Sequence, residues 1–235
     1  MRTISMFLTT GLFLFLGATA TEAATTTNSY ATATSSTSVD PQVRANVSHS
    51  GSPCSNILVG KDKMPVAICS RSLGRTPEVV LFDKTGKQRL TARALYRYSS
   101  SATIPAYLDQ HGWLVLVNGD RVLWRLSHSQ LPSGKWSFGL SESADLTRTV
   151  TASDSVVGLQ PDSSGRVWFA TASGIVGTAN TSYNVVKSIH LKSGERIEQD
   201  IALSSSRVKV TSTRAVYTLT ADSNGVPKIV SRTAR

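Results

Sequence analysis

The residue types that most often carry chemistry are sparse in this sequence. Its four histidines are scattered along the 235 residues: His49, His111, His128 and His190. No two of them have the i, i+2 or i, i+4 spacing that presents two ligands to one metal ion. We therefore expect each histidine to be an ordinary surface or partly buried residue, and we predict no metal site and no cofactor.

Motifs for covalent or phosphate chemistry are also missing from the sequence. It contains no Gly-x-Ser-x-Gly nucleophile elbow, no phosphate-binding loop and no dinucleotide-binding fingerprint. A site assembled from loops of several repeats would leave no local motif, so an enzyme stays open as an alternative to a binding protein.

One turn motif, Asp-x-x-Gly, occurs four times. The copies begin at Asp83, Asp109, Asp162 and Asp222 and end at Gly86, Gly112, Gly165 and Gly225. The carboxylate of such an Asp can accept bonds from backbone N–H groups further along the turn, and glycine tolerates the positive φ that follows. A calcium loop places several oxygens at alternate positions, whereas each of these Asp residues is isolated. We therefore predict four structural turns.

The segments between these turns read as short strands rich in Val, Ile, Leu, Tyr and Trp. The clearest unit has four strands: Ile104–Leu108, Trp113–Val117, Arg121–Leu126 and Lys135–Leu140. In the first unit the fourth strand is expected at Gln88–Ala92. The units recur every forty to fifty residues or so, the spacing of propeller blades. The predicted fold is all-β, a propeller-like array of about four four-stranded antiparallel blades. The array is either a closed four-bladed propeller or an incomplete one.

The N-terminal residues predict export. Arg2 precedes an apolar run, Met6–Leu16, and Ala18-Thr19-Ala20 supplies small residues for cleavage. We assign 1–20 to a signal peptide, 21–52 to a flexible Ser/Thr-rich leader and 53–235 to the propeller-like domain, which makes the protein secreted, or periplasmic in a Gram-negative host. Asn46 and Asn180 begin N-glycosylation sequons, which matter only in a glycosylating host.

The two cysteines, Cys54 and Cys69, suggest one disulfide in an exported protein. If Gly60 to Lys63 turns the first hairpin, both cysteines lie equally far from its centre and face each other across the strand pair. A zinc site is the weaker alternative, because two cysteines without a histidine cluster cannot complete four ligands.

The stretch Gln160–Thr171 resembles the blade motif of NHL, SMP-30 and two-component-regulator propellers, an Asp-x-x-Gly turn followed by a strand with a Trp. A weaker copy spans Asp109 to Val115. The resemblance implies a propeller over roughly residues 55–235 and a group that includes lactonases, lyases, quinoproteins and binding scaffolds. The acidic Glu-Gly-Pro motif of the SMP-30 lactonases is absent from this sequence.

Four tryptophans are candidates for stacking on a carbohydrate or aromatic ligand: Trp113, Trp124, Trp136 and Trp168. Large aromatic side chains also suit packing between blades. Trp113 and Trp168 occupy similar places after an Asp-x-x-Gly turn. We therefore expect packing, not ligand binding, to be their main role.

The net charge of the protein indicates which kinds of partner it could bind. Twenty-five Lys and Arg oppose fifteen Asp and Glu, for a net charge of +10, and the basic residues are scattered. A positive net charge is compatible with an anionic ligand, whose identity is unknown. We do not expect nucleic acid, because the basic residues form no run. We predict a binding or interaction scaffold without a transmembrane anchor. The alternatives are a lactonase-, lyase- or quinoprotein-like enzyme, or a truncated propeller whose exposed apolar blade face would drive self-association.

Overall fold

The structure is a computed structural model that describes residues 41–49, 52–60, 63–69, 77–89, 93–94, 104–109, 111–119, 121–180, 185–198, 201–204 and 207–235. The predicted signal peptide and the first part of the predicted leader lie outside these residues. Within them the protein is nearly all β, with one short helix, α1 (Pro41–Asn46). No helix in the described ranges is long and apolar enough to span a membrane.

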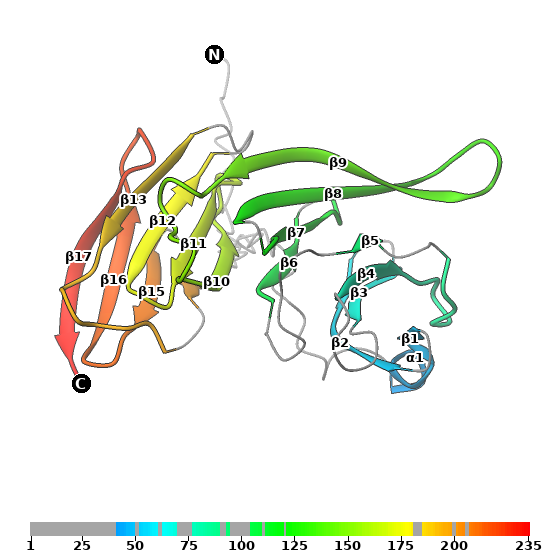
Figure 1. Cartoon of the computed structure of the whole chain (residues 1–235), viewed down its shortest axis with the longest axis horizontal. Helices are drawn as coiled ribbons and strands as arrows, with labels where there is room; N and C mark the ends of the chain where they lie inside the picture. The colour runs from blue at the N-terminus through cyan, green and yellow to red at the C-terminus, as the bar shows by residue number, and fades with distance from the viewer. Residues whose placement is uncertain are drawn as a thin grey trace, which may run out of the picture.

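The strands form four antiparallel sheets in which chain order equals spatial order (Figure 1). Blade 1 contains β1 (Ser48–His49), β2 (Ser52–Val59), β3 (Pro65–Cys69), β4 (Glu78–Leu81) and β5 (Arg93–Ala94). Blade 2 contains β6 (Ala106–Leu108), β7 (Leu114–Val117), β8 (Val122–Gln130) and β9 (Trp136–Asp145). Blade 3 contains β10 (Val156–Pro161), β11 (Val167–Thr171), β12 (Ile175–Ala179) and β13 (Val186–His190). Blade 4 contains β14 (Ala202–Ser204), β15 (Arg207–Thr211), β16 (Ala215–Ala221) and β17 (Pro227–Ala234).

The four blades follow one another as an arc. Contacts between neighbouring blades join their first strands, β2 to β6, β6 to β10 and β10 to β14. Blades 1 and 4 lie at opposite ends of the molecule (Figure 1). The predicted propeller-like array of four blades is confirmed, and its described part forms an open arc.

Each interface between blades is an apolar core. Leu81 and Leu116 belong to the cluster between blades 1 and 2, and Trp168 and Tyr217 to the cluster between blades 3 and 4. The middle strands of the inner blades, such as β7 and β11, are buried along their whole length. A strand that is covered on both faces reads as a continuous apolar run, which explains why strict alternation is missing there.

The outer face of blade 1 is covered by α1. Val43 and Val47 pack on the apolar residues of that face, and Asn46 Nδ2 donates a hydrogen bond to the Thr85 carbonyl at 2.8 Å. A Cβ on Gly86 would lie 2.6 Å from the Asn46 Cβ, so only glycine allows this approach. The prediction of a flexible leader is therefore wrong for residues 41–49, because two valines in a polar tract supply an apolar face.

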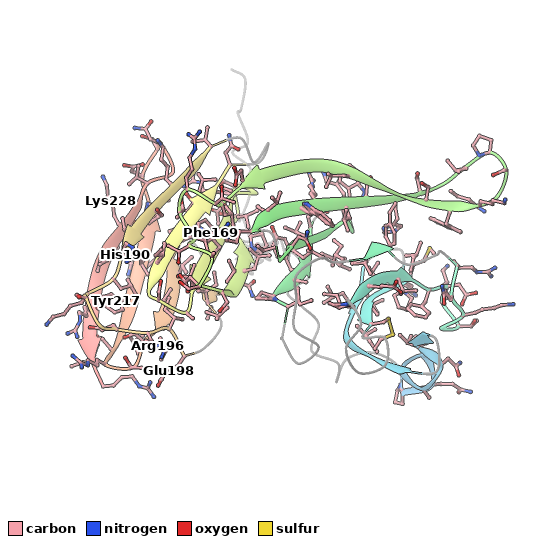
Figure 2. All side chains as sticks on the ribbon, in the orientation of Figure 1. Phe169, His190, Arg196, Glu198, Tyr217 and Lys228 are labelled. Carbon is pink, nitrogen blue, oxygen red and sulfur yellow. A yellow bond between two sulfur atoms is a disulfide. The ribbon has the colours of Figure 1, made fainter. Side chains whose placement is uncertain are left out.

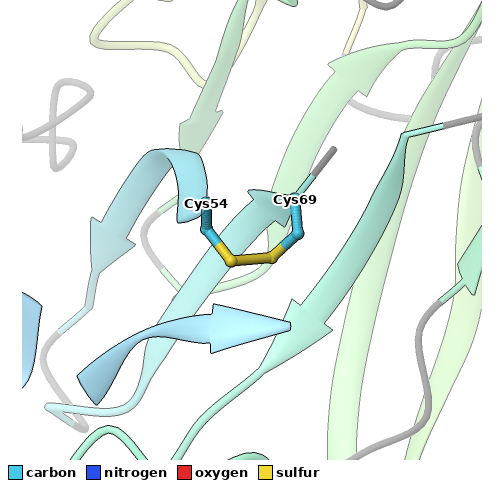
Figure 3. The surroundings of a disulfide bond; sticks show 2 residues. All are labelled: Cys54 and Cys69. Atoms are coloured by element: carbon cyan, nitrogen blue, oxygen red, sulfur yellow. A yellow bond between two sulfur atoms is a disulfide. The ribbon is translucent and has the colours of Figure 1, made fainter. Parts of the chain in front are cut away.

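The disulfide between Cys54 and Cys69 is confirmed (Figure 3). The two residues face each other in the register of β2 and β3, with their Cα atoms 4.0 Å apart. The symmetry of the hairpin about its turn was the signal in the sequence. The bond ties the first two main strands of blade 1 together.

Two strand predictions differ from the structure. After β2, β3 and β4, the fourth strand of blade 1 is the two-residue β5, whereas Gln88 forms an isolated bridge with Phe82 and residues 90–92 lie outside the described ranges. In blade 2, β8 and β9 run four and five residues beyond the predicted Arg121–Leu126 and Lys135–Leu140. The extra residues of β8, 127–130, pair one to one with residues 139–136 of β9. The extra residues of β9 pair with the first half of β8, past a β-bulge between Arg125 and Leu126.

Candidate binding site

The four Asp-x-x-Gly turns share one hydrogen-bond pattern. Each Asp Oδ1 accepts bonds from the backbone N–H groups two and four residues later, at 2.8–3.1 Å. Each Asp carbonyl accepts a bond from the Gly N–H at 2.9–3.0 Å, and the four glycines have φ between 79° and 83°. These carboxylates are therefore used by the backbone of the turn, which needs glycine at its end.

When the two-residue β1 is left out of the count, all four turns lie where the first or third strand of a blade ends, and we call this end of the blades the turn rim. Contacts place the turns of neighbouring blades together: Arg166 Nη1 donates to the Asp222 carbonyl at 3.5 Å, and Thr178 Oγ1 donates to the Gly225 carbonyl at 2.5 Å. Lys228, near the turn rim of blade 4, and Glu198 lie at opposite ends of that blade in Figure 2. We call the other end of the blades, where Glu198 lies, the opposite rim.

The second carboxylate oxygen of each turn binds a neighbouring strand. Asp109 Oδ2 contacts Arg125 Nε and Nη2, both at 2.5 Å, and the Arg125 guanidinium lies 4.6 Å from the centre of the Trp113 ring. Asp162 Oδ2 accepts a hydrogen bond from Trp168 Nε1 at 3.2 Å. The Arg125 guanidinium and the Trp168 indole N–H thus satisfy the second oxygens of the Asp109 and Asp162 carboxylates. Trp113 therefore contacts Arg125 of its own blade, and Trp168 binds Asp162 of its own blade while its ring packs in the core between blades 3 and 4.

The hairpin of β8 and β9 extends beyond its sheet as an arm, residues 127–140. Its tip is a tight turn in which Gly134 N–H donates to the Leu131 carbonyl at 2.8 Å and Leu131 N–H to the Lys135 carbonyl at 2.7 Å. β7 pairs with β8 only as far as Leu126, so the arm part of β8 pairs with β9 alone. Figure 1 shows the arm running past blade 1. Trp136 and Phe138 anchor it to the core between blades 1 and 2.

A groove of about 760 Å³ opens on the turn rim between the arm and blade 1. Its lining comes from the first and last turns of blade 1 and from the arm tip: Met64, Asp83, Lys84, Thr85, Arg89, Gln130, Gly134, Lys135 and Trp136. This volume is in the range of sites that hold a drug-sized molecule or a few residues of peptide. We call this groove, with its whole lining, the arm groove. Met64 and the half-buried Trp136 form its apolar part.

The arm groove carries excess positive charge. Asp83 accepts hydrogen bonds from the Thr85 hydroxyl at 2.6 Å and from two backbone N–H groups, and these bonds, with the charge of Arg89, lower its pKa to about 2. Asp83 Oδ2 lies 2.8 Å from Arg89 Nη2, so these two charges cancel. Lys84 and Lys135 are exposed and have no carboxylate partner among the described residues. The groove therefore favours an anionic ligand.

The other predicted candidates are dispersed. His111 is exposed in a turn with its ring 5.1 Å from that of Trp113, and His190 is exposed at the end of β13. The His128 ring lies 6.1 Å from the Trp136 ring, on the arm. His49 is in β1, where its side chain lies outside the described set, and Trp124 is buried between blades 1 and 2. Among the described residues no three His, Cys, Asp or Glu side chains gather as a metal site.

The two predicted sequon asparagines occupy different positions. Asn46 is exposed at the end of α1, but its Nδ2 already donates to the Thr85 carbonyl. Asn180 follows β12 and is half-buried, while residues 181–184 lie outside the described ranges. A glycan on Asn46 would use the nitrogen that holds α1 to blade 1.

A smaller groove of about 520 Å³ lies on the opposite rim, between blades 3 and 4 and the loop that precedes β10. Its hydroxyl groups largely bind one another and Asp154, whose Oδ2 accepts a bond from Ser173 Oγ at 2.5 Å and whose Oδ1 accepts one from the Ser173 N–H at 3.0 Å. Thr151 and Ser153 also pair, with 3.2 Å between their hydroxyl oxygens. Because these groups satisfy each other, we rank the arm groove first.

The arm groove was missed by sequence reasoning. Leu131-Pro132-Ser133-Gly134 carries the signal for a tight turn, Pro at the second position and Gly at the fourth, and it could have fixed the tip of a long hairpin. The side of the arm that faces blade 1 depends on packing between residues far apart in the chain. Trp136 was weighed only as one of four tryptophans, and its place in the groove needed the structure.

No family model and no curated protein matches the chain. Solved structures match it over most of its length. A protein from Lactobacillus plantarum has a TM-score of 0.55 at 10% identity, with 77% of this chain and 56% of that chain covered. YCF48 from Cyanidioschyzon merolae has 0.46 at 12% identity, with 78% and 58% covered. The Neurospora crassa Pan2 WD40 domain has 0.45 at 12% identity, with 83% and 52% covered.

These likenesses concern the fold. The chain spans about half the length of the structures that it matches. The assignment of a propeller-like array rests on the four antiparallel sheets and their order in the chain.

Proposed function

We propose that this chain is an exported, propeller-like binding scaffold that holds an acidic peptide segment of a partner protein in the arm groove. The observation that carries this function is the combination of Trp136 with two lysines, Lys84 and Lys135, in one open groove. A half-buried indole can pack on an apolar side chain of the ligand, and the lysines attract its carboxylates.

A peptide suits this groove because the arm offers main-chain groups along an edge. The part of β8 beyond Leu126 pairs with β9 on one side only. An extended peptide can add to such an edge through backbone hydrogen bonds, while its alternate side chains enter neighbouring pockets. Gln130 and Gly134 line the groove next to this edge.

Export is the second part of the proposal. The N-terminal pattern of Arg2, Met6–Leu16 and Ala18-Thr19-Ala20 supports it, and the disulfide fits an oxidising compartment. We also propose that the blades are of the NHL, SMP-30 and two-component-regulator type. The turn at Asp162 followed by the buried Trp168 supports this assignment.

The test measures binding of a fluorescein-labelled ten-residue peptide of Glu with one central Phe, by fluorescence anisotropy at low salt. We expect saturable binding to the wild-type protein, and about tenfold weaker binding to K84Q/K135Q, because two opposing charges are lost in a groove that excludes some water. W136A is expected to weaken binding also at high salt, since the apolar contact is not screened.

The matched control is R148Q/K192Q, which removes two positive charges from exposed residues of loops on the opposite rim. It should bind the peptide within about twofold of the wild type if the site is local. Equal losses in both double variants would show attraction to net charge only. Binding of the same strength by a Gln-for-Glu version of the peptide would also contradict the proposal.

A further inference from the structure

The outward face of blade 4 is polar, unlike the faces buried between blades. Alternation along β15 and β16 sends Val208, Val210 and Tyr217 into the core with blade 3 and leaves Lys209 and Thr218 on the other side. The strand registers extend that outer face to its neighbours on both sides. Its members are Ala202, Arg207, Lys209, Thr211, Val216, Thr218, Thr220, Lys228, Ser231 and Thr233.

This surface, the blade 4 face, has no acidic side chain among its described members. Lys228 Nζ lies 3.4 Å from Asp222 Oδ2, which belongs to a turn of the turn rim. Arg207 and Lys209 are exposed and make no ion pair with any described residue. The face therefore has uncompensated positive charge beside rows of hydroxyl groups.

A further blade of the same kind would be a poor partner for this face. The three interfaces between blades are lined by large apolar side chains, whereas the members of the blade 4 face are apolar only at Ala202 and Val216, with the exposed Ile229 and Val230 beside them on β17. Burying Arg207 and Lys209 against an apolar sheet would remove their hydration without replacing it. At this end of the array, self-association of an incomplete propeller through an apolar blade face stays a prediction.

We propose that the blade 4 face binds a carboxylated or sulfated polysaccharide, independently of the arm groove. Neighbouring residues on one side of a sheet recur every 6–7 Å or so along a strand and about 5 Å across strands, which gives a grid that a β-bulge in β17 interrupts between Ile229 and Ser231. On this grid Thr218, Thr220 and Ser231 can donate to and accept from sugar hydroxyls. Arg207 and Lys209 supply cations for the acidic groups of the chain.

Charge complementarity and flatness favour a polysaccharide over a membrane surface. A protein that lies on a lipid surface usually inserts large apolar or aromatic side chains between the headgroups. The described blade 4 face carries no aromatic side chain. Its branched apolar residues are the partly exposed Val216 and, at the bulge of β17, Val230, with Ile229 next to it. Hydroxyl groups instead match a ligand that is itself rich in hydroxyls.

The test uses biolayer interferometry on immobilised polygalacturonate, with dextran as the neutral polymer. We expect the wild-type protein to bind polygalacturonate, with affinity that falls as salt is raised, and R207Q/K209Q to bind about tenfold more weakly. T218V should weaken binding by about threefold, because it removes a hydroxyl and keeps the shape. R148Q/K192Q is the control of equal charge and should stay within about twofold of the wild type.

Thermal melting of each variant shows whether the fold is retained, and T218V keeps the test valid if R207Q/K209Q does not fold. Equal losses in R207Q/K209Q and R148Q/K192Q would overturn the proposal, since binding would then report net charge. Binding to vesicles of anionic phospholipid without binding to polygalacturonate would overturn it in favour of a membrane. Because the peptide assay uses other residues and another ligand, failure here leaves the arm groove to its own test.

Discussion

Glu195 is a buried carboxylate in the loop between blades 3 and 4. Its side chain is fully buried, with Oε2 accepting a hydrogen bond from Ser212 Oγ at 2.5 Å and Oε1 one from Arg232 Nη2 at 2.8 Å. Arg232 Nε also donates to the Tyr217 hydroxyl at 3.0 Å. Figure 2 shows Tyr217 on blade 4 and Arg196, the neighbour of Glu195, on the loop that leads into it. The cluster joins that loop to two strands.

These contacts predict how stability depends on pH. The hydrogen bond from Ser212, followed by that from Arg232, lowers the pKa of Glu195 to about 2. A carboxyl group with a lowered folded-state pKa stabilises the protein above its ordinary pKa, and this stabilisation is lost as pH falls toward the folded-state value. E195Q should therefore be less stable than wild type at pH 7, and the difference should shrink between pH 5 and pH 2, as measured by urea unfolding.

A constant difference between E195Q and wild type across this pH range would contradict the assignment. The sequence could not reveal the cluster, because Glu195 lies 17 residues from Ser212 and 37 from Arg232. By contrast, Cys54 and Cys69 belong to one hairpin, so their pairing could be predicted from its turn, although a β-bulge between Cys54 and Asn56 sets the register that brings them opposite each other. Partners that share a local element are predictable, and partners joined only by packing are not.

The turns show what an element contributes beyond its own backbone. Asp109 and Asp222 make the same bonds within their turns, but their ion pairs differ in exposure. The side chains of Arg125 and Asp109 are 14% and 8% exposed, whereas those of Lys228 and Asp222 are 63% and 25% exposed. The first pair is therefore shielded from water and the second is largely screened.

We predict that D109A destabilises the protein more than D222A does. Both lose the turn bonds, but D109A also removes the shielded ion pair with Arg125, and breaking a buried pair costs about 3 kcal/mol. An exposed pair such as Lys228–Asp222 contributes about 1 kcal/mol or less. Equilibrium unfolding in urea measures both, and equal losses would mean that the turn bonds alone matter.

The turn chemistry also explains how many elements could be predicted. Asp162–Gly165 and Ser173-Gly174 mark turns because their glycines adopt a positive φ. The strands of blade 3 on either side of these turns are therefore predictable from the sequence. The extension of β8 and β9 was missed because Ser127–Gln130 is polar and reads as a loop. Those residues form a strand because β9 pairs with them and Trp136 and Phe138 hold the arm on the core.

At the scale of the whole molecule, each blade packs on its sequence neighbours, as in a linear repeat array. The repeats in the sequence predicted the blades, but their open arc could not be predicted, because it depends on contacts between sheets that no turn motif encodes. In such an array, weakening one end unit should disturb that unit first.

The disulfide provides the test. C54S/C69S is expected to lose about 3 kcal/mol of stability in the chain-entropy model. Hydrogen exchange followed by mass spectrometry should show faster exchange in β2, β3 and β4 of blade 1, with little change in β15 and β16 of blade 4. A uniform increase in exchange over all four blades would show that the array unfolds as one cooperative unit.

The open arc also has a mechanical consequence. In a closed ring the first and last blades hold each other, so a pull on the two ends of the chain is shared by the whole circle. In this arc, blades 1 and 4 stand at opposite ends, and a pull across them is carried by three interfaces in series (Figure 1). The blades would then yield one after another, while the bond between Cys54 and Cys69 prevents the 15-residue segment that it spans from lengthening.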